Sequence, residues 1–511
     1  MLSKVYSAGL LGIDGFIVCC ETDVGSGLPQ TVLIGYLASE VREAADRVRT
    51  AIKNSGYLLS PKKIVINLSP ADIKKESCNF DLPIALSILS SYGIIKTEAF
   101  NGCIFAGELS LSGKLLSIKG TLSIAIAAKK AGFKKLYVPS ANASEGSVIE
   151  GIECFGIEDL NSLVSVLNGE KTHPPHAIYN ESGYDYEIGG DFSDINGQEM
   201  LKRATIIAVA GRHNILYIGP AGTGKSMIAS RIPAIMPIMS MEERLETSRI
   251  YSVCGMLDAD KPLLKKRPYR NPHHSISPNA LVGGGIKPKP GEISLANHGV
   301  LFLDELAEFK RETLEILRQP MEEGRVSISR LMGSYVFPAD FMLIAATNPC
   351  KCGFYPDRNR CNCNINQIKH YLGKISKPLL DRIDICVETR LLNYDELRKH
   401  GSGQKSTEIR KIVENARIIQ NERFKNDGIL FNSQMDKKLV DIYCTLSKKD
   451  EEFLKDIYES RSMSVRSVHK ILKVARTSAD IDKSEQICRR HICEAISYRS
   501  LEEKYWGGIM R

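Results

Sequence analysis

The stretch GPAGTGKS, residues 219–226, has residue types and spacing suited to holding phosphate groups. It fits the pattern G-x-x-x-x-G-K-[ST] at every fixed position and follows the apolar run LYI. Its glycines let backbone N–H groups turn toward phosphate oxygens, a lysine can neutralise the β and γ oxygens, and a hydroxyl can bind Mg²⁺. The predicted ligands are ATP and Mg²⁺, and the predicted contacts are Gly219, Pro220, Ala221, Gly222, Thr223, Gly224, Lys225 and Ser226.

Two carboxylates end a second apolar run, GVLFLDEL, residues 299–306. We expect Asp304 to hold the magnesium, directly or through water, and Glu305 to orient or deprotonate an attacking water. An apolar run followed by Asp-Glu is, by itself, more often a strand end that enters a loop. Its position downstream of the phosphate loop favours the hydrolytic interpretation.

Three further polar residues could complete such a site. Asn348 ends the apolar run FMLIAATN and could hydrogen-bond the water or the γ-phosphate, while Arg382 and Arg466 lie in ISKPLLDRIDI and SVRSVHKILKVAR. An arginine beside a transferring phosphoryl group stabilises the charge that develops there, and a neighbouring subunit can supply it. Taken singly, either arginine would more simply be a surface or helix-capping residue.

Four cysteines lie in the short stretch CKCGFYPDRNRCNC, residues 350–363. Four thiolates can enclose zinc tetrahedrally, although this C-x-C spacing is tighter than the usual C-x2-C. A redox-sensitive pair and free thiols therefore stay open as alternatives. We favour a structural zinc, because a reducing cytosol disfavours permanent disulfides and four thiolates leave no open position for catalysis. The predicted zinc ligands are Cys350, Cys352, Cys361 and Cys363, in a loop that also carries Lys351, Arg358 and Arg360.

The elements that must position these residues fall into several segments, since 511 residues exceed one hydrophobic core. Residues 1–170 alternate β-rich runs with helical patterns and predict an α/β or α+β domain. A linker rich in Pro, Gly and polar residues is expected over 171–188. Residues 189–395 contain the continuous apolar runs HNILYIG, GVLFLDE and DFMLIAATN, typical of strands buried in a parallel sheet. Residues 396–511 read as a helical lid in which Ser464 would cap one helix.

Composition narrows the class of protein further. The net charge of +8 is mild, and it permits a polyanionic partner without requiring one. No apolar run of the sequence reaches the roughly 18 to 20 residues that span a bilayer, and the N-terminus lacks the apolar core of a signal peptide. We therefore expect a cytoplasmic protein with no membrane partner.

The motifs in their order resemble the magnesium-chelatase-like AAA+ ATPases of the YifB/ComM type, over nearly all of the chain. The residues that carry the resemblance are GPAGTGKS, RNPHHSISPNALVGGG, GVLFLDEL, AATNPCKCG, LLDRIDI and SVRSVHKILKVART. The resemblance implies an AAA+ P-loop NTPase core with a helical lid, a homo-hexamer, and Arg382 and Arg466 as arginine finger and second sensor. It further implies a DNA helicase that drives branch migration in recombination or natural transformation. The chelatase half of the resemblance leaves open a motor that remodels a protein client or inserts a metal into a tetrapyrrole.

The first domain resembles the proteolytic domain of Lon-type proteases, through FAGELSLSGKLLSIKGTLSIAIAAKKAGFKKLYVPSAN. The catalytic lysine of that pattern, four residues after a glycine that matches Gly120, is here Ile124. The serine-bearing segment KKESCNFDLPIAL also departs from the pattern, although Ser77 lies nearby. A serine hydroxyl without an amine base is a poor nucleophile, so we expect no protease activity.

Two inserts in the core are candidates for contact with DNA. One is NPHHSISPNALVGGGIKPKPGEISLAN, with Lys287 and Lys289, and the other is the predicted hairpin GRVSISRLMGSYVFPAD, with Arg330 near its turn. No acidic residue occurs from Lys261 to Gly291, and contact with phosphate backbones needs charge without sequence readout. A solvated basic face is the competing interpretation. The adjacent His273 and His274 should point to opposite sides of an extended segment, which favours packing or phosphate proximity over metal binding.

Overall fold

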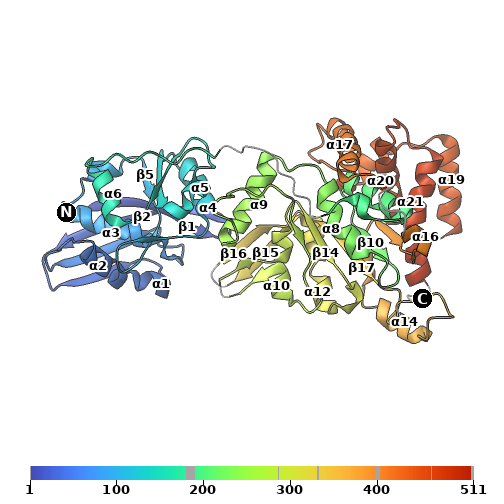
Figure 1. Ribbon diagram of the computed structural model, residues 1–511, viewed down its shortest axis with the longest axis horizontal. Helices are drawn as coiled ribbons and strands as arrows, with labels where there is room; N and C mark the ends of the chain where they lie inside the picture. The colour runs from blue at the N-terminus through green and yellow to red at the C-terminus, as the bar shows by residue number, and fades with distance from the viewer. Residues whose placement is uncertain are drawn as a thin grey trace. The chain divides into compact units, whose positions relative to one another are not determined.

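The computed structural model describes residues 2–179, 190–285, 287–330, 333–397, 403–461 and 463–507. The chain forms two compact units (Figure 1). The first comprises Met1–Tyr184, Ser240–Lys265 and Ser327–Phe337, and the second comprises Asp185–Met239, Lys266–Val326 and Pro338–Arg511. Two segments of the predicted core range thus belong to the first unit. The predicted domain boundaries stay predictions, and residues 180–188 of the predicted linker lie outside the described residues.

Two sheets form the frame of the first unit. The larger has the order β1-β2-β4-β3, with β1–β2 and β2–β4 antiparallel and β3–β4 parallel. The smaller is parallel with the order β5-β8-β9, and β6 and β7 form a short antiparallel pair. The strands are β1 Ser3–Leu11, β2 Asp14–Gly25, β3 Gln30–Ile34, β4 Lys63–Ser69, β5 Cys103–Phe105, β6 Glu108–Leu109, β7 Leu115–Leu116, β8 Lys135–Pro139 and β9 Glu153–Ile157.

The helices of the first unit cover these sheets with apolar faces. Every residue of α3 is buried, and its one acid, Asp81, is held by Arg47, whose Nε lies 2.6 Å from Oδ2. The helical stretch that begins at Ser39 is interrupted at Glu43, which separates α1 from α2. The helices are α1 Ser39–Arg42, α2 Ala44–Asn54, α3 Asp81–Ser91, α4 Thr121–Lys130, α5 Ala143–Gly146, α6 Leu160–Leu167 and α9 Met241–Cys254.

The second unit contains a parallel sheet with the order β11-β14-β17-β10-β18. The three strands predicted from continuous apolar runs are confirmed as β10, β14 and β17, whose residues are all buried, as strands covered on both faces must be. A mixed α/β fold with this parallel sheet is consistent with a P-loop AAA+ core. The strands are β10 Ile215–Ile218, β11 Tyr269–Arg270, β14 Val300–Leu303, β17 Met342–Thr347 and β18 Ile385–Glu388.

Helices of the second unit pack on this sheet and on one another. In Figure 1, α17, α20 and α21 gather beside β10 and α8, and α17 packs on both α7 and α8. Ser464 caps α20 as predicted, since its side chain accepts a hydrogen bond from the Ser467 N–H. The helices are α7 Glu199–Gly211, α8 Lys225–Ile235, α10 Pro278–Val282, α11 Glu292–Leu295, α12 Arg311–Glu315, α13 Arg318–Glu323, α14 Ile365–Leu372, α15 Lys377–Leu380, α16 Tyr394–Leu397, α17 Ser406–Arg423, α18 Lys437–Tyr443, α19 Lys448–Ser460, α20 Val465–Ile481 and α21 Arg489–Glu502.

Two small β-ribbons interrupt the elements of the sheet. β12 (Gly283–Gly284) pairs antiparallel with β13 (Lys289–Pro290), and β15 (Arg325–Arg330) pairs with β16 (Gly333–Pro338), as the hairpin prediction required. Residues 331 and 332 of the predicted hairpin lie outside the described residues. Within the part of the chain that the structure describes, no helix has the length and apolar character needed to cross a membrane.

Candidate nucleotide site

The stretch 219–226 forms the turn between β10 and α8, where the carboxyl end of a central strand meets a helix N-terminus. Gly222 and Gly224 have φ values of 76° and 86°, and the space where a Cβ would stand is open at both. Backbone N–H groups at such a turn can face an anion. A Cβ on Gly219 would overlap Thr389, so this position must stay glycine for the loop to rest on β18.

Two residues that the sequence analysis missed hold the loop in place. The hydroxyls of Thr223 and Thr389 lie 2.7 Å apart, and Gln198 Nε2 donates to the carbonyls of Thr223 at 3.3 Å and Arg390 at 2.6 Å. Nothing in the local sequence links Gln198 to the loop, because the contact forms only when α7 packs beside the sheet. The loop is therefore supported from two directions before any ligand binds.

Lys225 is buried at the base of the loop. Its Nζ donates to the carbonyls of Gly219 and Pro220, both at 2.7 Å, and to Asn348 Oδ1 at 3.3 Å. Burial lowers the pKa of this ammonium to about 8, against the opposing effect of Asp304 and Glu305. Phosphate oxygens would offer the ammonium a charged partner in place of these neutral acceptors.

The hydroxyl and the two carboxylates predicted to serve magnesium and water meet at the same sheet edge. Ser226 Oγ donates to Asp304 Oδ2 at 2.5 Å, and the Glu305 N–H donates to Asp304 Oδ1 at 2.9 Å. Glu305 has the left-handed φ of 51°, a strained backbone conformation of the kind that occurs at functional sites. A hydroxyl beside a carboxylate is an all-oxygen donor set of the kind Mg²⁺ prefers.

His274 is a further candidate, to which the sequence analysis gave no role in hydrolysis. Its Nδ1 lies 3.3 Å from Glu305 Oε2. The expectation that His273 and His274 point to opposite sides is wrong, because the chain turns at His274 and the two ring centroids lie 4.0 Å apart. His274, with the His273 ring beside it, therefore lies next to the carboxylate that is predicted to activate water.

Arg382 lies at the other end of the sheet from the phosphate loop. It precedes β18, and its carbonyl accepts from Asn214 Nδ2 at 3.1 Å, beside the amino end of β10. The four residues of β10 separate that end from Gly219 by roughly 13 Å. The guanidinium donates to the Pro378 carbonyl at 2.6 Å and to Glu322 at 2.5 Å.

Arg466 is exposed in the first turn of α20. One turn further along, Lys470 Nζ donates to the Ile383 carbonyl at 3.0 Å, just before β18 begins. The first turn of α20 therefore also lies toward the amino ends of the strands. The structure brings Lys225, Ser226, Asp304, Glu305 and Asn348 together, but it does not bring either arginine to them.

Comparison with known proteins identifies the family of the chain. Residues 191–397 match the family described as magnesium chelatase, subunit ChlI, residues 20–142 match subunit ChlI of Mg-chelatase, and residues 403–499 match the ChlI C-terminal family. The chain is 40% identical over 505 residues to the uncharacterized protein YifB of Salmonella typhimurium, covering 98% of this chain and 97% of that protein. It is also 40% identical over 504 residues to the competence protein ComM of Haemophilus influenzae, with 98% of each chain covered. The chain belongs to the YifB/ComM-type, magnesium-chelatase-like family.

Magnesium-chelatase subunits are more distant from this YifB/ComM-type chain. The subunit ChlI of Bigelowiella natans is 25% identical over 254 residues, which is 40% of this chain and 64% of that protein. Membership of a magnesium-chelatase-like AAA+ family implies an ATPase, in agreement with the loop, hydroxyl and carboxylates described above.

The basic residues of the YifB/ComM-type chain separate into two groups. Lys287, Lys289 and Arg330 are exposed on the two β-ribbons. Arg270 instead pairs with Glu292 at 2.6 and 2.8 Å, and Arg267 donates to the Pro237 and His298 carbonyls at 2.7 and 2.6 Å. The basic segment Lys261–Gly291 therefore presents less charge to a polyanion than its sequence indicates.

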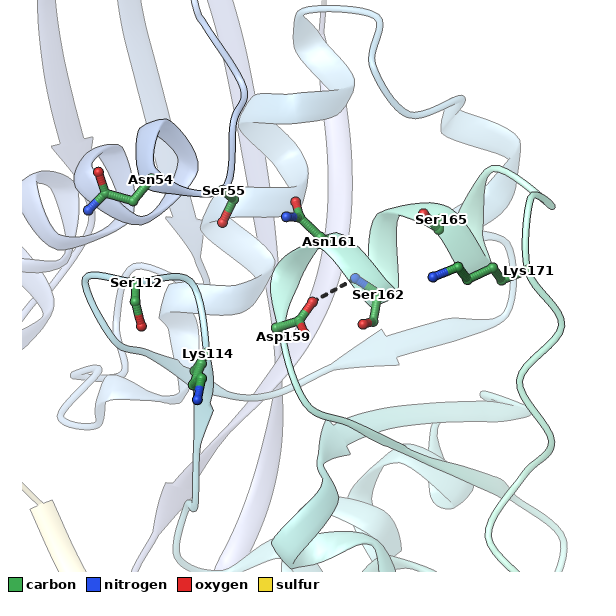
Figure 2. Close-up of a pocket in the computed structure, with 9 residues that line it drawn as sticks. All are labelled: Asn54, Ser55, Ser112, Lys114, Asp159, Asn161, Ser162, Ser165 and Lys171. Carbon is green, nitrogen blue, oxygen red and sulfur yellow. Dashed lines mark hydrogen bonds between the residues drawn. The ribbon is translucent and has the colours of Figure 1, made fainter.

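The first unit of the YifB/ComM-type chain carries a polar pocket of about 300 Å³, shown in Figure 2. Its drawn hydrogen bond, from the Ser162 N–H to Asp159 Oδ1 at 2.8 Å, is the N-cap of α6. In the described residues that line it, no serine hydroxyl is hydrogen-bonded to a lysine amine. The lining residues are Asn54, Ser55, Ser112, Lys114, Asp159, Asn161, Ser162, Ser165 and Lys171.

The protease-related positions are also accounted for. Ile124 is fully buried in α4, and Ser77 accepts from the Asn79 N–H at 3.4 Å as the cap of a short 3-10 turn. The Ser77 hydroxyl therefore has a structural role as the cap of this turn. The Lon-like fold and the absence of protease activity stay predictions.

Proposed function

We propose that this chain is an ATP-hydrolysing motor that acts on DNA as a helicase, in branch migration during recombination or natural transformation. The observation that carries the ATPase part is the meeting of Lys225 with Asn348 and of Ser226 with Asp304 at one sheet edge. The DNA part rests on the competence protein ComM of Haemophilus influenzae, which matches along nearly its whole length.

Each residue has a distinct role in this proposal. Lys225 binds the β and γ oxygens, Ser226 and Asp304 hold Mg²⁺, and Asn348 detects the γ-phosphate. Magnesium, when bound, neutralises charge on the phosphate oxygens. Glu305 orients the attacking water and accepts its proton, which requires the carboxylate to leave His274.

The position of Arg382 favours an assembled ring, proposed here as a homo-hexamer. An arginine at the amino ends of the strands is too far from its own phosphate loop to touch a γ-phosphate there. A copy placed head to tail could bring Arg382, and Arg466 from the same end of the sheet, to a neighbour's loop. Both arginines would then act in trans.

Lys287, Lys289 and Arg330 are the proposed contacts with the DNA backbone, because they are basic and exposed on the two β-ribbons. The first domain would be an added Lon-like module without protease activity. The cytoplasm stays the predicted location.

A second candidate is a motor that remodels a protein client or inserts a metal in the manner of a chelatase. The three family descriptions, which all name the ChlI subunit, favour it. Against it, the ChlI relative of Bigelowiella natans matches only 40% of this chain.

The test is the steady-state ATPase rate of the purified chain alone, with single-stranded DNA and with a four-way junction. The proposal expects stimulation by DNA that is stronger for the branched form. If an assembled ring hydrolyses ATP at the same rate with and without DNA, the motor that acts on a protein client or in a chelatase becomes the favoured function. Absence of hydrolysis in the assembled ring would overturn both.

A further inference from the structure

The loop between β17 and α14 brings four thiol groups together. All four Sγ atoms lie within 4.8 Å of one another. Cys350 Sγ lies 3.3 Å from that of Cys352 and 3.7 Å from that of Cys361, and the Cys352 and Cys361 sulfurs are 3.6 Å apart. Cys350 and Cys361 are buried, Cys363 is half-buried and Cys352 is exposed.

These separations fit a tetrahedral metal site. Four sulfurs placed about 2.3 Å from a zinc ion would lie roughly 3.8 Å from one another, close to the observed values. A disulfide would need sulfurs about 2.0 Å apart. We propose that Cys350, Cys352, Cys361 and Cys363 bind one zinc ion, and that this ion fixes their loop against the phosphate loop.

The loop is built to support such a site. The Tyr355 N–H points to Cys350 Sγ at 3.4 Å, and the Cys361 N–H donates to the Asp357 carbonyl at 2.8 Å. Arg358 donates to the Cys363 carbonyl at 2.9 Å. Zinc with four thiolates carries a net charge of −2, which cationic groups of the same loop, Lys351, Arg358 and Arg360, can balance.

Few other interactions could hold this segment. Eight of the ten residues 351–360 are exposed, among them Lys351, Phe354 and Arg358, so the loop has almost no apolar core of its own. Thiolate coordination can supply the missing stabilisation, because the ion joins both ends of the loop and each thiol releases a proton on binding.

The loop contacts the proposed nucleotide site at two points. Gly353, with φ of 86°, has its Cβ position 3.9 Å from the backbone nitrogen of Ala221 in the phosphate loop. Asn348, two residues before the first cysteine, accepts from Lys225. Loss of zinc should therefore loosen the support of the phosphate loop and weaken nucleotide binding. This second step rests on the proposed ATPase function, whereas the metal site does not.

The first experiment measures zinc in the full-length chain purified with a reductant, by elemental analysis and by release to a colorimetric chelator. About one zinc per chain is expected. Cys352→Ser should lose most of it, Cys352→His should keep it because imidazole can replace one thiolate, and Cys493→Ser, at an exposed cysteine of α21, should be unchanged. If the wild-type chain contains no zinc and its mass is two or four hydrogens below that of the fully reduced chain, the four cysteines form disulfides and the zinc site is refuted.

The second experiment measures the affinity of the same variants for a fluorescent ATP analogue, with circular dichroism to show that each is folded. Cys352→Ser should bind at least about fivefold more weakly, and Cys352→His should restore the affinity. Unchanged affinity in a zinc-free, folded Cys352→Ser chain would overturn the coupling. A wild type that holds zinc but binds no nucleotide would overturn the proposed ATPase function and leave the metal site standing.

Discussion

At the scale of single residues, Glu305 is the group on which turnover should depend most. Glu305→Gln keeps the side-chain shape but removes the proton acceptor, so ATP should still bind while hydrolysis falls about 10²-fold or more. The measurement pairs the affinity for an ATP analogue with the steady-state rate. Glu312→Gln, at an exposed glutamate of α12, is the matched control and should leave both unchanged. Undiminished hydrolysis by the Glu305 variant would refute the assignment.

His274 should restrain that same carboxylate. Because its ring lies 3.3 Å from Glu305, His274→Ala should free the carboxylate and raise hydrolysis in the absence of DNA by about threefold, with a smaller remaining response to DNA. His273→Ala removes the neighbouring ring, whose Nδ1 lies 2.8 Å from Ser275 Oγ, and leaves the Glu305 contact intact. Equal basal rates in the two variants would contradict this role.

At the scale of elements, a partly buried charge cluster joins α20 to the amino ends of the strands. Asp384 lies 3.1 Å from His213 Nδ1 and 3.6 Å from Lys470 Nζ. Burial alone would raise the pKa of the Asp384 carboxyl, but His213 and Lys470 lower it below its usual range. The unfolded chain then binds this proton more readily than the folded chain, so stability from this group is present above about pH 4 and is lost as the pH falls further.

Asp384→Asn should therefore cost about 2 kcal/mol in the free energy of unfolding at pH 7. It should also flatten the loss of stability below pH 4, since no carboxylate remains to be protonated. Denaturant titrations at several pH values measure both effects. Asp381→Asn, three residues earlier, should change neither, and an identical acid profile for Asp384→Asn and the wild type would contradict the prediction.

The elements also show what the sequence could and could not predict. Apolar runs identified β10, β14 and β17, because burial on both faces leaves a continuous local signal. The edge strand β11 has two residues and carries too little pattern to recognise. Gln198 reaches the phosphate loop only after α7 packs, and the contact of His274 with Glu305 joins residues that are distant in sequence. Local motifs thus identify the residues that can do chemistry, whereas the residues that hold them in place can be recognised only in the folded chain.

At the scale of the whole molecule, the position of Arg382 can be tested by mixing inactive chains. Arg382→Ala should lower hydrolysis about 10³-fold if the guanidinium stabilises the transferring phosphoryl group. A mixture of Arg382→Ala with Glu305→Gln would contain interfaces that combine an intact Glu305 with an intact Arg382. Such interfaces should restore about a quarter of the wild-type rate in a randomly mixed ring.

Glu322→Gln controls for the loss of the ion pair within the chain, because it removes the negative charge beside Arg382 and keeps the arginine. That variant should hydrolyse ATP at nearly the wild-type rate. A mixture with no more activity than its two components would show that Arg382 does not act between chains.

The separation of Arg382 from Gly219 has a consequence for how activity is switched on. If a neighbouring chain supplies Arg382, the complete active site lies at the interface between two chains. A single chain can then bind ATP but not hydrolyse it. Dilution should then lower the rate per chain steeply, and a scaffold that gathers chains would restore it. Assembly of the ring around a substrate would then itself activate ATP hydrolysis.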